Sequence, residues 1–151
     1  MIDGVAVKPL RRLVDERGYL MEILRSDEEL FRQFGQAYVS ACFPGIIKAW
    51  HCHRVQFDYF CCLAGNLKVG LYDDRADSAT RGQTQSVVIG ELAPALVCIP
   101  PHVWHGFMAV GGQSALVLNL TTETYRYDDP DELRRDPLDP QIPFSWRSEG
   151  W

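Results

Sequence analysis

The sequence has no hydrophobic run long enough to cross a membrane as a helix, which requires about 20 apolar residues in a row. Residues 1–12 also lack the apolar stretch of a secretory signal, so we expect no signal peptide. The five cysteines are an odd set without CxxC spacing, which argues against a disulfide framework. We therefore expect reduced, mostly buried thiols in a cytoplasmic protein, at Cys42, Cys52, Cys61, Cys62 and Cys98.

Positive charge is also scarce, since the chain has 15 Lys and Arg but 20 Asp and Glu, which gives a net charge of −5. This balance argues against nucleic acid or an anionic membrane as a partner, but it leaves room for a local basic pocket that binds one phosphorylated ligand. The 151 residues include 46% hydrophobic ones and no internal repeat. We expect a single globular domain, residues 1–151, with its own core.

Helical periodicity is missing from most of the chain. Short apolar segments alternate with Gly, Pro and Asp about every ten residues, which is typical of antiparallel sandwiches and barrels. Ala64-Gly65-Asn66 has the composition of a hairpin turn. The predicted strands are 38–43, 46–53, 58–65, 66–74, 85–90, 95–100, 105–110 and 114–120.

Two short helices are expected outside this β-rich region. Ser26 and Glu29 form a capping box, and Gly35 is placed to end the helix that it begins. Asp129-Pro130 predicts a second helix, because Asp is a good cap and Pro fits the first turn. The Pro-rich residues 136–146 should pack irregularly over the surface.

Histidine occurs in only two short segments of the chain. His51 and His53 lie in one segment, and His102 and His105 lie in the other. Residues two apart on a strand project from the same face, so His51 and His53 share a face. Imidazole is a base near neutral pH and also the commonest metal ligand. The clustering therefore predicts one functional site, built from both segments.

The spacing in the first segment resembles the first motif of the cupin family. Gly45, His51, His53 and Gly65 fit that motif, with Asp58 in place of its usual glutamate. The cupin resemblance implies an all-β jelly-roll barrel, here with a short N-terminal helix and a short C-terminal helical segment. The mouth of such a barrel is a natural ligand cavity.

The second segment, residues 100–105, resembles the second cupin motif, with His102 where a glycine is usual and His105 as the histidine of the motif. In cupins the two motifs lie on facing hairpins.

Four segments resemble the dTDP-4-dehydrorhamnose 3,5-epimerases, in the same order along the chain. They are DERGYLMEI (15–23), KAWH (48–51), YDDRADSATRGQ (72–83) and IPPHVWHGF (99–107). The HCHR sequence at 51–54 is closer to the sugar-nucleotide 3,4-ketoisomerases. The resemblance implies an epimerase or keto-isomerase of a dTDP-linked 4-keto-6-deoxy sugar in deoxysugar biosynthesis. It also implies a homodimer and no cofactor.

Such a reaction removes a proton from the carbon beside a ketone, so the enzyme needs a base and a group that stabilises the enolate oxygen. The resemblance assigns the base to His51. Lys48 takes the position of an arginine and keeps its positive charge without the bidentate fork. In this interpretation His53 or His105 helps to polarise the ketone.

The resemblance also implies substrate contacts outside the histidine pair. Arg17 and Glu22 match residues that help to hold the nucleotide, and His105 matches a residue of the substrate pocket. Arg75 belongs to the match at 72–83. It is either a substrate-binding residue or a structural residue at the end of a strand.

Three departures from the epimerases leave the reaction open. Asp58 stands where they have a lysine, and Asn119 stands at the position of their catalytic tyrosine, with Tyr125 and Tyr127 nearby. Both Asp58 and Asn119 are candidate substrate contacts. In the epimerases, the aspartate that orients the base lies beyond the segment that matches 142–146, and this sequence has no residue to match it. We therefore expect Asp58 or another acid to take its role.

Three interpretations follow from this residue set. In the first, the protein is a metal-free nucleotide-sugar enzyme with His51 as the base. In the second, His51, His53, Asp58 and His105 bind a divalent metal such as Fe, Mn, Ni or Zn. In the third, the protein is a cupin that binds a sugar nucleotide without catalysis.

Overall fold

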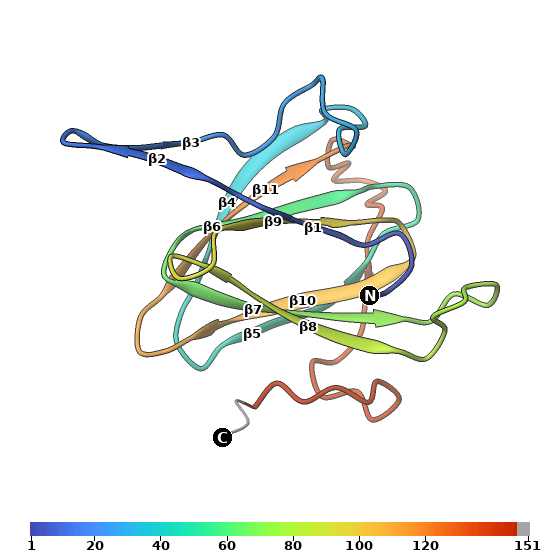
Figure 1. Ribbon diagram of the computed structural model, residues 1–151. Coiled ribbons are helices and arrows are strands. Elements are labelled where there is room, and N and C mark those ends of the chain that lie inside the picture. Colours follow the sequence, from blue (N-terminus) through green and yellow to red (C-terminus); the bar gives the residue numbers. More distant parts are fainter. Residues whose placement is uncertain (148–151) are drawn as a thin grey trace.

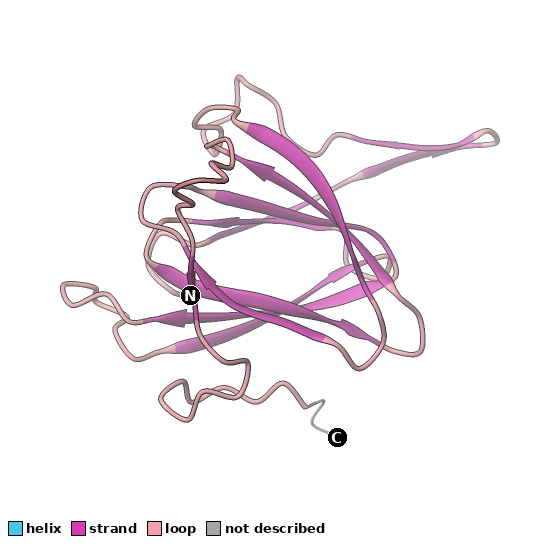
Figure 2. Ribbon diagram, turned by 180° about the vertical axis from the view of Figure 1, so that it is seen from behind, coloured by secondary structure: helices cyan, strands magenta, loops and turns pink. Residues whose placement is uncertain are grey.

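The computed structural model describes residues 1–147, which form two five-stranded antiparallel sheets facing each other (Figures 1 and 2). The predicted all-β jelly roll is confirmed. The first sheet has the order β1 (Ala6–Pro9), β9 (Ala95–Ile99), β6 (Asp58–Ala64), β11 (Ala115–Thr121), β4 (Gln36–Cys42). The second has the order β12 (Leu133–Arg134), β5 (Ile47–Cys52), β10 (Val103–Val110), β7 (Asn66–Asp73), β8 (Thr84–Gly90).

A separate hairpin follows β1 in the chain and belongs to neither sheet. It consists of β2 (Arg12–Asp15) and β3 (Gly18–Met21), and it projects from the body of the molecule (Figure 1). The sequence did not predict these strands, because each has only four residues and most of them are exposed. Short exposed strands lack the alternation of buried and exposed residues on which strand prediction depends.

Alternation along each strand sends neighbouring side chains to different layers. Cys62 packs in the central core between the sheets, with Val69 and Val117. The adjacent Cys61 points the other way, into a cluster with Tyr59 on the outer face of the first sheet. All five cysteines are free and buried, as the sequence predicts.

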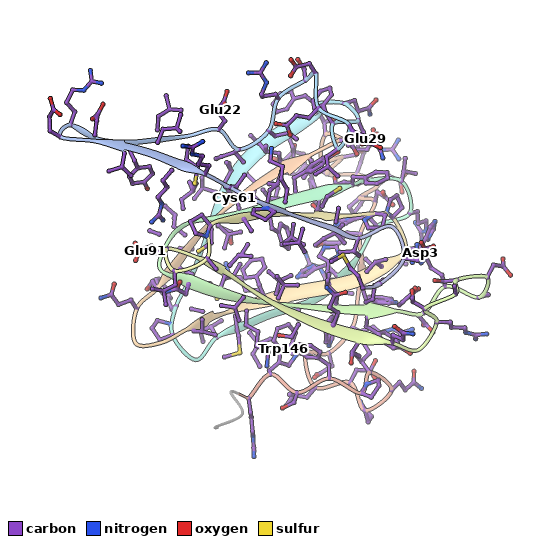
Figure 3. The ribbon with its side chains drawn as sticks, viewed as in Figure 1. Asp3, Glu22, Glu29, Cys61, Glu91 and Trp146 are labelled. Atoms are coloured by element: carbon purple, nitrogen blue, oxygen red, sulfur yellow. The ribbon has the colours of Figure 1, made fainter. Side chains whose placement is uncertain are left out.

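The C-terminal segment covers the outer face of the second sheet (Figures 1 and 3). The ring of Trp50 lies 5.3 Å from that of Phe144 and 4.9 Å from that of Trp146. The indole N–H of Trp146 donates to the carbonyl oxygen of Pro137, at 3.0 Å. Because Trp50 faces this outer layer, its neighbour His51 faces the space between the sheets.

Neither predicted helix is present among residues 1–147. Residues 26–30 form tight turns, because Leu24 and Leu30 pack onto the outer face of the first sheet. The Gly35 N–H does not follow a helix end but donates to the carbonyl oxygen of Thr121, at 2.8 Å. None of the described residues forms a helix long and apolar enough to cross a membrane.

The helix expected at Asp129-Pro130 is replaced by a loop that leads into β12. Asp131 uses its carboxylate to accept hydrogen bonds from the backbone N–H groups of Arg54, Val55 and Gln56, at 2.8, 2.9 and 3.1 Å. The acidic residues of this segment therefore serve another loop and not a helix N-terminus. Pairing of Arg134 with His51 then fixes the register of β12 beside β5.

Candidate active site

A cavity of about 870 Å³ lies between the two sheets and contains the clustered histidines. The second sheet contributes His51 from β5 and His105 from β10, which are directly paired in the sheet register. The first sheet contributes Asp58 from the start of β6 and Asn119 from β11. Six of the predicted site residues line this cavity: Lys48, His51, His53, Asp58, His105 and Asn119.

His51 is paired with an acid. Its Nδ1 lies 2.7 Å from Oε1 of Glu132, which is partly buried and precedes β12. The hydrogen bond to His51 is the main cause that lowers the pKa of Glu132 to about 2, so this carboxylate is an anion at neutral pH. Glu132 is therefore an acid in a position to orient the ring of His51.

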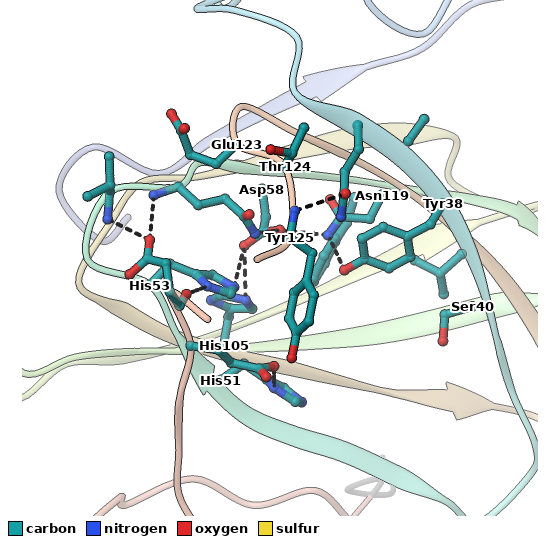
Figure 4. Close-up of a pocket in the computed structure, with 18 of the residues that line it drawn as sticks. Tyr38, Ser40, His51, His53, Asp58, His105, Asn119, Glu123, Thr124 and Tyr125 are labelled. Atoms are coloured by element: carbon teal, nitrogen blue, oxygen red, sulfur yellow. Dashed lines mark hydrogen bonds and ion pairs between the residues drawn. The ribbon is translucent and has the colours of Figure 1, made fainter. Parts of the chain in front are cut away.

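Asp58 lies between the two other cavity histidines (Figure 4). Its Oδ2 is 3.1 Å from Nε2 of His53 and 3.3 Å from Nε2 of His105. Burial favours the neutral form of this carboxyl group, but the two adjacent rings, when protonated, donate hydrogen bonds and positive charge that outweigh burial and hold the pKa of Asp58 well below its ordinary value. The carboxylate is therefore negatively charged in the interior of the protein.

Backbone carbonyl groups orient both of these imidazole rings. Nδ1 of His53 bonds the carbonyl oxygen of Asp131, and Nδ1 of His105 lies 3.0 Å from the carbonyl oxygen of Val103. A carbonyl oxygen can only accept, so Nδ1 carries the proton in each ring. Nε2 of each ring, the atom that faces Asp58, is then an unprotonated acceptor whenever the ring is neutral.

Asn119 holds the other oxygen of the Asp58 carboxylate. Its Nδ2 donates to Asp58 Oδ1 at 2.6 Å and to the hydroxyl of Tyr38 at 2.8 Å (Figure 4). Nε2 of Gln56 donates to the same carboxylate oxygen at 3.1 Å. Asn119 therefore fixes the orientation of the Asp58 carboxylate. Because its side chain is an amide, it cannot replace the tyrosine of the epimerases as a proton donor.

The remaining wall of the cavity comes from the loop between β11 and β12. Tyr125 points into the cavity from this loop (Figure 4) and is 42% exposed. Lys48, on the opposite wall, donates from Nζ to the hydroxyl of Ser40 at 2.8 Å. Arg126 and Arg134 also line the cavity and add positive charge at its rim.

The four-residue metal site considered from the sequence is not assembled as a whole. Among the described residues, His53, Asp58 and His105 are the only group of three or more whose ligand atoms all lie within 4.8 Å of one another. His51 is directed to Glu132 and does not join this group. Of the four predicted ligands, His51 is therefore separate and pairs with Glu132, whereas the other three lie together.

Three predicted substrate contacts lie outside the cavity of this chain. Arg17 is at the turn of the projecting hairpin, where it pairs with Asp15. Glu22 follows that hairpin and pairs with Arg25 at 3.2 Å (Figure 3). Arg75 donates from Nε and Nη2 to the buried carboxylate of Asp73, at 2.9 and 2.8 Å.

His102 also lies outside this cavity. Its φ of 65° explains why a glycine is usual at this position of the motif. Its backbone N–H donates to the carbonyl oxygen of His53 at 2.7 Å, so this turn helps to hold the first histidine segment in place.

Comparison with known proteins identifies the family. The family model of dTDP-4-dehydrorhamnose 3,5-epimerase matches residues 1–150. A spore coat polysaccharide biosynthesis protein of Bacillus subtilis is 43% identical over 149 residues, covering 99% of both chains.

Two solved structures share the fold of this chain. A dTDP sugar isomerase from Desulfovibrio desulfuricans G20 is 37% identical, with a TM-score of 0.90 over 96% of this chain and 92% of that one. A dTDP-6-deoxy-D-glucose-3,5-epimerase from Legionella pneumophila Philadelphia 1, in complex with dTDP-4-keto-L-rhamnose, is 26% identical, with a TM-score of 0.86 over 97% and 80% of the two chains. The expected enzyme class, an isomerase of nucleotide sugars, is confirmed. The chain belongs to the dTDP-4-dehydrorhamnose 3,5-epimerase family.

Proposed function

We propose that this protein epimerises or keto-isomerises a dTDP-linked 4-keto-6-deoxy sugar, with His51 as the base that removes a proton beside the ketone. The observation that carries this proposal is the His51–Glu132 pair in the wall of a cavity of about 870 Å³. A volume of this order suits a small-molecule ligand. The reaction belongs to deoxysugar and glycan biosynthesis.

Glu132 gives His51 the properties of a base. The carboxylate accepts a hydrogen bond from the Nδ1–H group, which favours the tautomer whose Nε2 is unprotonated and able to take a proton from carbon. When that proton arrives, the anionic Glu132 stabilises the imidazolium. This step requires no metal or organic cofactor, because a neutral imidazole is itself a sufficient base.

Tyr125 is our candidate for the acid that returns a proton. It is a cavity tyrosine on the same loop as Glu132, and a phenol can donate a proton to an enolate. Lys48 supplies positive charge on the opposite wall, where an enolate oxygen would be stabilised. Arg126 and Arg134 at the rim are suited to the diphosphate of the substrate.

We further propose that the protein acts as a homodimer in the cytoplasm. The projecting hairpin exposes Leu13, Val14, Tyr19 and Leu20, an apolar surface that pairing with a second chain would cover. In such a dimer Arg17, at the turn of the hairpin, and Glu22, directly after it, would contact the second chain. The five unpaired cysteines suit a reducing compartment.

The direct test is NMR of the purified protein with dTDP-4-keto-6-deoxyglucose in deuterated water. Deuterium at C3 or C5 supports epimerisation, whereas migration of the keto group to C3 supports the keto-isomerase. A protein that binds dTDP but exchanges no carbon-bound hydrogen would be a non-catalytic binder, and the proposal would fail.

A further inference from the structure

We infer that the hydroxyl group of Tyr38 donates a hydrogen bond to the ketone oxygen of the substrate and, together with Lys48, stabilises the enolate that forms when His51 removes a proton. The inference rests on the proposed function. Tyr38 lies on β4 in the first sheet, faces the sheet that carries His51, and lines the cavity. It is not among the residues that the sequence motifs single out.

The first observation is the orientation of the Asn119 amide. One of its polar atoms lies 3.2 Å from the backbone nitrogen of Tyr59. A backbone N–H group can only donate, so this amide atom is the oxygen and the other is the nitrogen. One hydrogen of that nitrogen is donated to Asp58 Oδ1, at 2.6 Å, and the second to the hydroxyl oxygen of Tyr38, at 2.8 Å (Figure 4).

The second observation is that the Tyr38 hydroxyl accepts in this contact. An amide nitrogen cannot accept, so the hydroxyl hydrogen is not used by Asn119, which is its only hydrogen-bond partner among residues 1–147. Partial burial raises the pKa of Tyr38 above the ordinary phenol value of about 10, so the hydroxyl keeps its proton at neutral pH. Tyr38 is 45% exposed and lines the cavity, and it therefore offers an oriented O–H donor to a bound sugar.

The third observation places a cation on the same wall. Ser40 lies two residues after Tyr38 on β4, so the two side chains project from the same face of the strand (Figure 4). The hydroxyl oxygen of Ser40 accepts from Nζ of Lys48, at 2.8 Å. An ammonium group has three N–H donors, so two remain for a ligand. A phenol and an ammonium group held in this way are donors suited to a developing oxyanion.

The position of His51 fits this arrangement. A base removes the proton from above or below the plane of the ketone, whereas a hydrogen bond to the ketone oxygen lies near that plane. The two groups must therefore approach the sugar from different directions. His51 on β5 and Tyr38 on β4 belong to the two facing sheets, and the cavity lies between them. In this arrangement Asn119 is a positioning residue, because it fixes the direction of the Tyr38 hydroxyl.

Tyr38→Phe tests the donor, because it removes only the hydroxyl group. The variant should lower kcat for deuterium exchange into dTDP-4-keto-6-deoxyglucose by about 10²- to 10³-fold, the usual cost of losing one donor to an oxyanion. Calorimetry should show that dTDP, which has no ketone, binds as tightly as to the wild type. Tyr72→Phe is the matched control, since Tyr72 is buried on the outer face of the second sheet, and its exchange rate should not change. Exchange by Tyr38→Phe at the wild-type rate would overturn the inference.

A spectroscopic test separates this inference from the proposed reaction. His51→Ala should bind the keto sugar without removing its proton, and infrared difference spectra with ¹³C at the ketone carbon report the stretching frequency of the bound C=O group. We expect a lower frequency in His51→Ala than in the double variant His51→Ala/Tyr38→Phe, because a hydrogen bond from Tyr38 weakens the C=O bond. His51→Ala/Asn119→Ala should lose much of this difference, and circular dichroism checks that each variant folds.

The outcomes of the two tests are distinct. Equal ketone frequencies with and without the Tyr38 hydroxyl would overturn the inference, even if the wild type exchanges deuterium. A Tyr38-dependent frequency with no exchange by the wild type would support Tyr38 as the group that binds the ketone and would overturn the proposed reaction. A frequency in the Asn119 variant equal to that of His51→Ala would overturn the positioning role of Asn119.

Discussion

Nδ1 of His51 and Oε1 of Glu132 lie 2.7 Å apart, although 81 positions separate the two residues in the chain. The short strand β12 creates this contact, because the pairing of Arg134 with His51 places the preceding glutamate beside the ring. A histidine and a carboxylate in this relationship form a base whose tautomer is fixed before substrate arrives.

The first prediction concerns this pair. Glu132→Gln should lower the rate of deuterium exchange by about 100-fold or more, because an amide stabilises neither the reactive tautomer nor the imidazolium. His51→Ala should abolish measurable exchange while the fold is retained. Glu123→Gln, which alters another carboxylate of the cavity wall, is the control and should exchange at close to the wild-type rate. Normal exchange by His51→Ala would remove this residue as the base.

Tyr125 provides a prediction about the second half of the reaction. Tyr125→Phe should keep exchange at the carbon that His51 deprotonates, but should slow formation of the rearranged sugar by about 10²- to 10⁴-fold, the usual contribution of a positioned acid. NMR follows both quantities in one sample. Tyr127→Phe is the matched control, since Tyr127 is 91% exposed. Equal product formation in the two variants would mean that another group returns the proton.

Asp73 gives a prediction about stability and pH. Its buried carboxylate accepts from Arg75, Ser78 and Thr80, and the Arg75 hydrogen bond is the main cause that holds its pKa well below the ordinary value. Because the pKa of Asp73 is lower in the folded state than in the unfolded state, ionisation of this group stabilises the fold. The stabilisation is complete at pH values above the unfolded pKa of about 3.9, and it is lost as the pH falls below that value.

Asp73→Asn should therefore lower the free energy of unfolding at pH 7 by about 2–3 kcal/mol, the scale for hydrogen bonds to a buried charged group. The difference from wild type should shrink as the pH is lowered below about 4. Urea denaturation at a series of pH values measures both effects. Asp77→Asn, which alters an exposed aspartate of the loop after β7, should change neither quantity. A difference that does not vary with pH would contradict the assignment.

The exposed hairpin predicts the oligomeric state. Size-exclusion chromatography with light scattering should give the mass of a dimer for the wild type and of a monomer for Leu20→Lys, because a buried lysine would oppose the apolar contact. Leu92→Lys places the same change at another exposed leucine, on the turn between β8 and β9, and should leave the dimer intact. A monomeric wild type would refute the proposed assembly.

Strand periodicity predicted the sheets well, since the eight predicted segments correspond to β4–β11 with small differences at their ends. Both helix predictions were wrong, because they depend on capping patterns of neighbouring residues and not on contacts with the rest of the fold. Ser26 and Glu29 have capping-box spacing, but burial of Leu24 and Leu30 against the first sheet outweighs it. Asp129-Pro130 has the composition of a helix start, yet the carboxylate of the next residue, Asp131, binds three backbone N–H groups of another loop.

The site was predictable where spacing alone defines it. His51 and His105 lie on paired strands, His53 directly follows β5, and Asp58 begins β6 in the facing sheet, so the arrangement of strands brings all four to one cavity. Glu132 could not be found in this way, because its place depends on the course of an irregular loop. Likewise, the separation of His51 from the other three depends on which ring finds which hydrogen-bond partner, and spacing carries no information about that.

The loop between β11 and β12 holds Tyr125, Asp131 and Glu132, whereas the histidines belong to or adjoin the sheets. In the proposed mechanism, the sheets thus present the imidazoles, and the loop between β11 and β12 carries the groups that direct proton transfer. Evolution could change the product by replacing that one connection and leaving the barrel untouched. For an engineer, grafting the β11–β12 connection between relatives is the smallest exchange that could redirect the reaction.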